Sequence, residues 1–295
     1  KISRPDENKE YLDFQQQLLQ YVATNAKGIG SPLIIPDTAG NTISQFQDRS
    51  GQTRMVRLLS WIGGRVWSDV NPQLEDLRYG LGAYCGQLTR ALQGFHHPMA
   101  VRRLDWDIAQ ASWTLDHLQL FNGGQKEIIS FFQQKFIQAQ PQYSGLRKAV
   151  VHNDANDNNI IVSQDLIHPI VVSVIDFGDA VYTQIINDVA IACTYAIMGH
   201  NDPLEAALPI VNGYHKVFPL QERELEYLYL AIAMRLVISV TKSAINKKEE
   251  PDNSYLLISE KPAWELLLKW KDINAHFAHY SFRAACGFTS HPAEE

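Results

Sequence analysis

The chain has 295 residues, of which 45% are hydrophobic and 20% are charged. These proportions are those of a globular protein that buries a sizeable core, and they exclude a disordered or fibrous chain. The 26 basic and 32 acidic residues give a net charge of -6. No basic run is long enough to follow a phosphate backbone, so we expect no nucleic-acid partner.

Cysteine usage and hydropathy bear on the compartment. Cys85, Cys193 and Cys286 lie far apart and form no Cys-x-x-Cys pair, so the sequence predicts neither a disulfide framework nor a structural zinc site, and a reducing compartment fits. The longest apolar stretch, residues 225–240, is interrupted by charged residues and falls short of the about 18 uninterrupted apolar residues of a membrane span. We therefore expect a cytoplasmic protein without a membrane partner.

The first 60 residues predict a small sheet that carries one helix. Ser3 and Pro5 have the chemistry of a helix start, and apolar side chains then recur on one face until Gly28. Short β-like runs follow at residues 32–36, 41–46 and 55–59. Because the chain opens directly in Lys1-Ile2-Ser3, which reads as the end of a strand, we expect further residues upstream of Lys1.

Helical periodicity dominates after the Gly63-Gly64 pair. At this pair we place the boundary between a small N-terminal lobe, residues 1–62, and a large C-terminal lobe, residues 63–295. Helices are predicted at residues 71–93, 105–120, 124–140, 222–244 and 263–279, and short strands at 150–151, 160–162 and 170–175. This order predicts an α+β fold with a sheet-bearing small lobe and a mainly helical large lobe.

A dense polar segment separates two of these strands. Residues 152–159 contain one His, two Asp and four Asn. Taken alone, the segment could be an Asx-rich turn, because Asn and Asp bond their own backbone and tolerate left-handed conformations. A second polar cluster, residues 176–179, follows the next strand. A strand that ends in Asp176 beside a loop with Asp154 and Asn159 would gather the oxygen ligands that suit Mg²⁺, as phosphoryl transfer requires.

The two segments together carry a resemblance. The pattern His-x-Asp-x-x-x-x-Asn, formed by His152, Asp154 and Asn159, precedes Ile-Asp-Phe-Gly-Asp at residues 175–179. The pair resembles the catalytic loop and metal-binding segment of the aminoglycoside phosphotransferase and choline kinase superfamily, relatives of protein kinases. Other stretches resemble the hydroxylysine kinase branch, namely residues 1–3, 12–15, 56–59, 63–65, 95–98 and Arg235. The resemblance implies a bilobal protein-kinase-like fold.

The resemblance also implies roles for the residues of the large lobe. Asp154 would be the catalytic base, and His152 a structural member of its loop. Asn159 and Asp176 would be the Mg²⁺ ligands, and Asp188 would buttress the loop. Asn153, one of the positions that depart from the family pattern, stands where the family commonly has Gly.

On the nucleotide side, the resemblance makes Lys1 the strand lysine that holds the α- and β-phosphates. Its helix partner would be Asp13, with Glu10 as the alternative. The interlobe hinge, whose backbone can bond a purine, would span residues 55–61, with Leu58, Leu59, Ser60 and Trp61 at the nucleotide. The two strands and the phosphate-covering loop that precede this lysine in the family are not in the chain.

The acceptor side leaves alternatives open. Asp107 either caps a helix, where its charge suits the positive end of the dipole, or lines an acceptor cleft together with Trp106. Arg235 interrupts an apolar helix, where a buried charge needs a partner, and that partner is either an internal carboxylate or the carboxylate of a substrate. Asp107 and Asp179 are the candidates for binding an amine.

The expected activity is Mg²⁺-dependent transfer of the γ-phosphate of ATP or GTP to a hydroxyl of a small amino-containing metabolite. The resemblance favours 5-hydroxylysine or a similar hydroxy amino acid as the acceptor. An aminoglycoside, choline, ethanolamine or homoserine kinase remains an alternative, and so does a nucleotide-binding pseudokinase.

Overall fold

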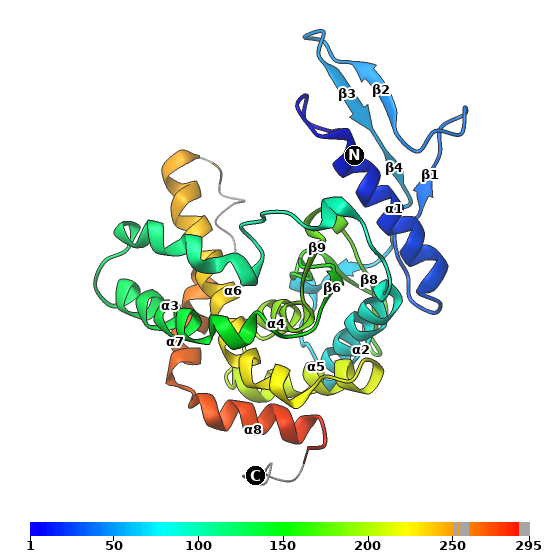
Figure 1. Ribbon diagram of the computed structural model, residues 1–295. Coiled ribbons are helices and arrows are strands. Elements are labelled where there is room, and N and C mark those ends of the chain that lie inside the picture. Colours follow the sequence, from blue (N-terminus) through cyan, green and yellow to red (C-terminus); the bar gives the residue numbers. More distant parts are fainter. Residues whose placement is uncertain (251–252, 254–259, 289–295) are drawn as a thin grey trace.

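A computed structural model describes residues 1–250, 253 and 260–288. A small lobe of one helix and short strands stands on a larger, mainly helical lobe (Figure 1). The elements of the small lobe are α1 (Lys9–Asn25), β1 (Ile34–Ile35), β2 (Ser44–Gln47), β3 (Thr53–Val56) and β4 (Leu58–Leu59). β1 pairs with β4, and β2 with β3, both antiparallel.

The large lobe contains the remaining elements. Its helices are α2 (Glu75–Leu92), α3 (Gly123–Tyr143), α4 (Ile185–Ala196), α5 (Pro203–Val217), α6 (Glu222–Glu249), α7 (Glu260–Asp272) and α8 (Ala275–Ala285). Its strands are β5 (Arg65–Val66), β6 (Lys148–Val151), β7 (Ile160–Val162), β8 (Val171–Val174) and β9 (Val181–Gln184). Its 3₁₀ segments are η1 (Trp67–Asp69), η2 (Pro98–Ala100), η3 (Ile108–Leu120) and η4 (Phe177–Asp179).

The short strands of the large lobe bring the two polar segments together. β7 lies between β5 and β8, and β6 pairs with β9, all antiparallel. The loop 152–159 therefore joins β6 to β7, while β8 leads directly into η4. The backbone N–H of Ile175 donates to the carbonyl of Asn159 over 2.8 Å. The loop 152–159 and the segment 176–179 are thus hydrogen-bonded neighbours.

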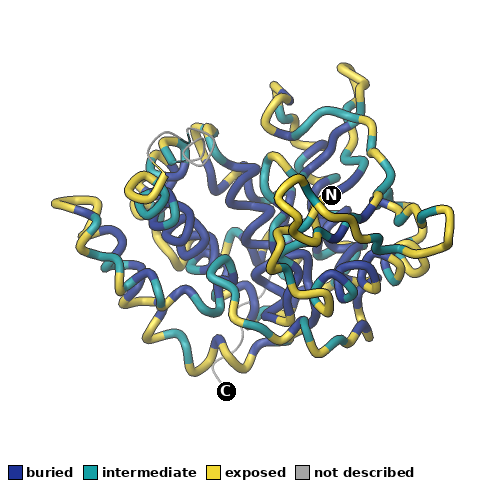
Figure 2. The backbone as a smooth tube through the Cα atoms, turned by 90° about the horizontal axis from the view of Figure 1, so that it is seen from above, coloured by how far each residue is buried: buried dark blue, intermediate teal, exposed yellow. Residues whose placement is uncertain are grey.

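Helix α6 forms the centre of the large lobe. Its most apolar 18-residue window has a mean hydropathy of 1.6, which is enough for a membrane span by composition, but 78% of that window is buried inside the fold. Helices α3, α4, α7 and α8 and the segment η3 pack around α6. Figure 2 shows buried backbone concentrated in the large lobe. We conclude that α6 is a core helix.

Three elements differ from the sequence-based expectation. Helix α1 begins at Lys9 and not after Ser3, because the side chain of Asn8 accepts the backbone N–H of Glu10 and caps the helix. Residues 263–279 form two helices, since Asn274 starts α8 by capping two backbone N–H groups. Residues 108–120 are 3₁₀ and not α-helical; only three side chains of this segment are buried, so packing gives little support to a regular amphipathic helix.

Candidate active site

The carboxylate of Asp154 is held at both oxygens. Oδ1 accepts a hydrogen bond from Arg235 Nη2 over 2.8 Å, and Oδ2 accepts from Asn159 Nδ2 over 2.7 Å and from Asn156 Nδ2 over 3.1 Å. Burial raises the pKa of Asp154 to about 7, although the guanidinium of Arg235 acts in the opposite direction. A carboxyl group with a pKa near neutrality is suited to accept a proton from a hydroxyl.

Arg235 is the buried counter-charge of this carboxylate. Its side chain is 1% exposed. Nε donates to the hydroxyl of Tyr195 over 3.2 Å, and Nη1 donates to the carbonyl of Trp106 over 2.8 Å. The guanidinium also lies 4.7 Å from the ring centre of Trp106 and 5.3 Å from that of Tyr195. Of the two alternatives for Arg235, the structure therefore shows the internal ion pair and not a cation open to a substrate carboxylate.

The side-chain amide of Asn159 is oriented by Asp154. Its Nδ2 donates to both the backbone carbonyl and Oδ2 of Asp154, which leaves Oδ1 on the other side of the amide group. Oδ1 of Asp176 accepts from Lys1 Nζ over 2.6 Å. Among the described residues, no group of three or more His, Cys, Asp or Glu side chains could hold a metal ion. One amide oxygen and one carboxylate fit Mg²⁺, which commonly takes few protein ligands and shares the phosphates of its nucleotide.

Two contacts fix the backbone of the catalytic loop. His152 accepts the N–H of Asp154 at Nδ1 over 3.2 Å, and its ring packs edge-on to Phe177 with centres 4.5 Å apart. Burial lowers the pKa of His152 to about 4, so the ring is neutral. The N–H of Asn153 donates to Asp188 Oδ1 over 2.9 Å, as expected of a buttress. Asn153 has a φ of 63°, which explains why glycine also suits this position.

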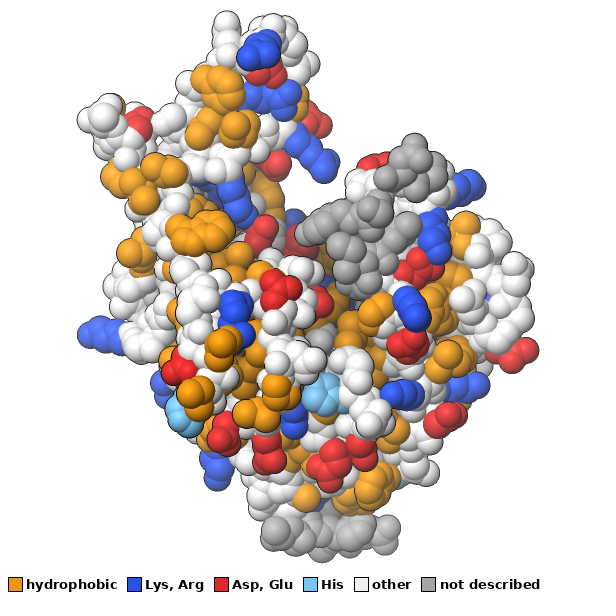
Figure 3. Space-filling model, turned by 180° about the vertical axis from the view of Figure 1, so that it is seen from behind, with side chains coloured by type: hydrophobic (Ala, Val, Ile, Leu, Met, Phe, Trp, Pro, Cys, Tyr) orange, Lys and Arg blue, Asp and Glu red, His pale blue; other side chains and the backbone are white. Residues whose placement is uncertain are grey.

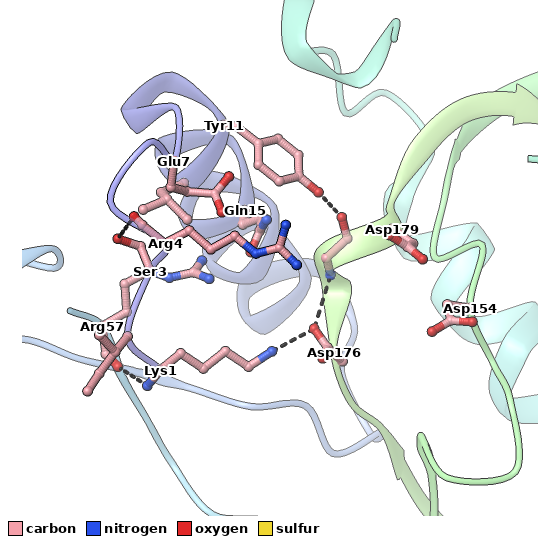
Figure 4. A pocket seen from close by; sticks show the side chains of 13 residues that line it. Lys1, Ser3, Arg4, Glu7, Tyr11, Gln15, Arg57, Asp154, Asp176 and Asp179 are labelled. Carbon is pink, nitrogen blue, oxygen red and sulfur yellow. Dashed lines mark hydrogen bonds and ion pairs between the residues drawn. The ribbon is translucent and has the colours of Figure 1, made fainter. Parts of the chain in front are cut away.

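A cavity of about 630 Å³ lies between the lobes. The small lobe contributes Lys1, Ile2, Ser3, Arg4, Glu7, Tyr11, Leu12, Gln15 and Arg57, and the large lobe contributes Asp154, Asp176, Gly178 and Asp179. Figure 3 shows a notch between the lobes with acidic and basic side chains at its base. Figure 4 shows Lys1 reaching from the small lobe to Asp176, with Asp154 and Asp179 beyond. The cavity thus brings Lys1 together with the loop 152–159 and the segment 176–179.

The structure does not bring Asp13 to Lys1. The carboxylate of Asp13 lies 3.8 Å from Lys9 on its own helix, while Lys1 pairs with Asp176. Glu10 is exposed and, like Asp13, does not line the cavity. The acidic side chain of this region that does line the cavity is Glu7. On α1, Phe14 packs against the ring of His97, while the side chain of the neighbouring Asp13 is 42% exposed.

The hinge residues also lie outside this cavity. Leu58 and Leu59 pair with β1, and the N–H of Ser60 donates to the carbonyl of Leu33 over 2.8 Å. Trp61 is 91% exposed. The residue of this stretch that lines the cavity is Arg57, which lies between β3 and β4. Sequence reasoning missed Arg57; the signal that could have found it is a single cation within the apolar run 55–59.

Asp107 and Asp179, the two candidates for binding an amine, differ in their access to the cavity. Asp107 is 2% exposed and caps η3, and it also accepts from Thr183 Oγ1 over 2.8 Å and from Gln110 Nε2 over 3.0 Å. Its cap alternative is therefore the one the structure supports, and Asp107 is not open to an amine. Asp179 does line the cavity. Burial raises the pKa of Asp179, opposed by Arg235 and Arg102.

The family of the chain is shown by its sequence. Residues 1–227 match the model of the phosphotransferase enzyme family, so the chain belongs to this family and is a phosphotransferase that acts on hydroxyl groups. Hydroxylysine kinase of Mus musculus is 26% identical over 294 residues, which cover 92% of this chain and 76% of that protein. Hydroxylysine kinase of Danio rerio is 25% identical over 282 residues, covering 90% and 79%. The chain is accordingly a small-molecule kinase.

Solved structures confirm the bilobal α+β fold of this class. An amicoumacin kinase in complex with AMP-PNP and Ca²⁺ superposes with a TM-score of 0.68 at 16% identity, covering 94% of this chain and 84% of the other. A microcompartment-associated aminopropanol kinase superposes with a TM-score of 0.66 at 16% identity, covering 97% and 82%.

Proposed function

We propose that the chain is a Mg²⁺-dependent kinase that transfers the γ-phosphoryl group of ATP or GTP to the hydroxyl of 5-hydroxylysine or a similar hydroxy amino acid. One observation carries the catalytic part: Asp154, with a pKa near neutrality, lines the same cavity as Lys1 and Asp176. The hydroxylysine kinases that align with over 90% of the chain support the acceptor. The AMP-PNP and Ca²⁺ bound to the amicoumacin kinase support a nucleotide donor and a divalent cation.

In the proposed reaction the acceptor oxygen attacks the γ-phosphorus, and the bond from this phosphorus to the β–γ bridging oxygen breaks. The hydroxyl proton goes to the carboxylate of Asp154. Oδ1 stays with Arg235, which keeps the carboxylate turned toward the acceptor. Lys1 moves from Asp176 to the donor phosphates. Mg²⁺, held by Asn159 Oδ1 and the carboxylate of Asp176, would neutralise the charge on the transferred group.

Asp179 is our proposed partner for the acceptor amine. It lines the cavity beside Asp154, and an ammonium group placed between two carboxylates gains favourable interactions with both. An acceptor that carries an amine near its hydroxyl is therefore expected to bind better than a neutral alcohol.

The test is a panel of acceptors assayed with ATP and with GTP. The panel contains hydroxylysine, homoserine, choline, ethanolamine, 1-amino-2-propanol and an aminoglycoside, with phosphate transfer measured by mass spectrometry. We expect the highest kcat/KM for hydroxylysine or a related hydroxy amino acid. A higher kcat/KM for an aminoglycoside or choline would refute the acceptor, and nucleotide binding without any transfer would indicate a pseudokinase.

A further inference from the structure

The backbone carbonyl of Gly178, within the metal-binding segment, accepts hydrogen bonds from two distant parts of the chain. Tyr11 on α1 donates its hydroxyl to this oxygen, and Arg102, between η2 and η3, donates Nη2 over 2.8 Å. Figure 4 shows the Tyr11 hydroxyl meeting the segment beside Asp179. Because Tyr11 belongs to the small lobe and Arg102 to the large lobe, one peptide group connects both lobes to the metal-binding segment.

Tyr11 and Arg102 also contact each other. The guanidinium of Arg102 lies 4.5 Å from the centre of the Tyr11 ring, a cation–π distance. Nη2 of Arg102 makes a second bond, to the carbonyl of Ala180 over 3.2 Å. Arg102 therefore spans the two carbonyls on either side of Asp179. All these contacts are partly buried, so water does not freely replace them.

Gly178 also contacts Asp176, through the N–H of the preceding peptide group. Asp176 has a φ of 65°, a left-handed conformation that is unfavourable for residues other than glycine and persists only where the surroundings hold it. Its Oδ1 accepts the N–H of Gly178 over 3.3 Å. Gly178 is thus bonded to the Asp176 carboxylate through its N–H, and to Tyr11 and Arg102 through its carbonyl.

We propose that Tyr11 and Arg102 are positioning residues: they hold Gly178, and through it the Asp176 carboxylate, in the orientation that binds the metal–nucleotide complex. The inference rests on the metal-binding role proposed for Asp176. It also couples the placement of α1 to the metal site, because the hydroxyl of Tyr11 reaches Gly178 only when α1 lies against the segment.

Titration calorimetry with a non-hydrolysable nucleotide, with and without Mg²⁺, tests the proposal. Tyr11→Phe removes one neutral hydrogen bond and should weaken Mg²⁺-dependent binding by about three- to tenfold. Arg102→Met removes charge-assisted bonds and should weaken it by about ten- to a hundredfold. Arg102→Lys should recover part of this loss, because an ammonium can reach one carbonyl but does not span both. Nucleotide binding without Mg²⁺ should not change.

The double variant and a matched control sharpen the test. Tyr11→Phe combined with Arg102→Met should lose less than the product of the single losses, since both act on one oxygen. Tyr21 lies on the same helix, and its hydroxyl donates to the carbonyl of Gln93 over 3.1 Å. The control variant Tyr21→Phe removes this hydroxyl and should leave Mg²⁺-dependent nucleotide binding unchanged.

Two results would overturn the proposal. Equal losses of nucleotide affinity with and without Mg²⁺ would indicate that Tyr11 and Arg102 contact the nucleotide itself, and an unchanged affinity in both variants would show that neither residue positions the site. Asp176→Ala separates this failure from failure of the metal assignment. If Asp176→Ala abolishes Mg²⁺-dependent binding while the Tyr11 and Arg102 variants bind normally, only the positioning role is lost. If Asp176→Ala binds normally with Mg²⁺, the proposed metal site itself is wrong.

Discussion

Replacing Arg235 by methionine should raise the pKa of the proposed catalytic base. The guanidinium is 1% exposed and donates to Asp154 Oδ1 over 2.8 Å, so the bond is charge-assisted and shielded from water. Such a bond contributes about 1.5–3 kcal/mol, which corresponds to about one to two pKa units at about 1.36 kcal/mol each. Burial already raises this pKa to about 7, so in the variant the base is mostly protonated at neutral pH.

The consequence is a displaced pH profile. Only the ionised base accepts a proton, so the acidic limb of kcat/KM should move up by about one to two pH units. At neutral pH kcat/KM should fall by about five- to fiftyfold and recover as the medium becomes alkaline. Acceptors with and without a carboxylate should lose the same factor, because Arg235 contacts the base and not the acceptor.

Steady-state kinetics across the pH range measures this effect, with circular dichroism to check folding. Lys242→Met is the matched control: it removes a cation from the same helix, whose Nζ lies 2.6 Å from Asp105 with side chains 23% and 41% exposed, and it should leave the profile in place. An Arg235→Met profile with an unmoved acidic limb and an equal loss at every pH would refute the reasoning.

Four further predictions concern the catalytic loop and the metal site. Asp154→Asn should lower kcat by about two orders of magnitude or more in steady-state kinetics, with nucleotide affinity little changed. Asp176→Ala should abolish Mg²⁺-dependent nucleotide binding in calorimetry, and adding Asn159→Ala should change little more, because ligands of one ion act as a unit. Burial lowers the pKa of His152 from 6.5 to about 4, so between these pH values the unfolded chain binds a proton at His152 and the folded chain does not. As the pH falls through this window, the wild type should therefore lose about 3 kcal/mol more unfolding free energy than His152→Gln, as measured by urea unfolding. Asn153→Ala should be about 1 kcal/mol less stable than Asn153→Gly, because φ is 63° here, and equal urea midpoints would contradict this.

The proximity of Asp154 and Asn159 could be predicted from the sequence because the geometry of their loop is local. Asp154 and Asn159 are five residues apart and bond each other, so their spacing alone carries the information. The strand before Asp176 could be predicted equally well, since its β-branched run ends where the acidic cluster begins.

Contacts between distant residues could not be predicted in the same way. Arg235 and Asp154 are 81 residues apart, and Tyr11 and Gly178 are 167 apart. Periodicity shows that α6 is buried, but it does not show which carboxylate pairs with Arg235. The misplacement of Asp13 has the same origin, because the rotation of α1 is set by its packing on the large lobe.

The ion pair between Arg235 and Asp154 has a consequence for the order in which the enzyme becomes competent during synthesis. Arg235 lies on α6, 81 residues after Asp154. A nascent chain that has emerged only as far as α5 contains the whole loop 152–159 but neither the cation that neutralises Asp154 nor the helix around which the large lobe packs. We therefore expect full phosphoryl transfer at neutral pH only once α6 has left the ribosome and the Arg235 guanidinium lies against Trp106 and Tyr195.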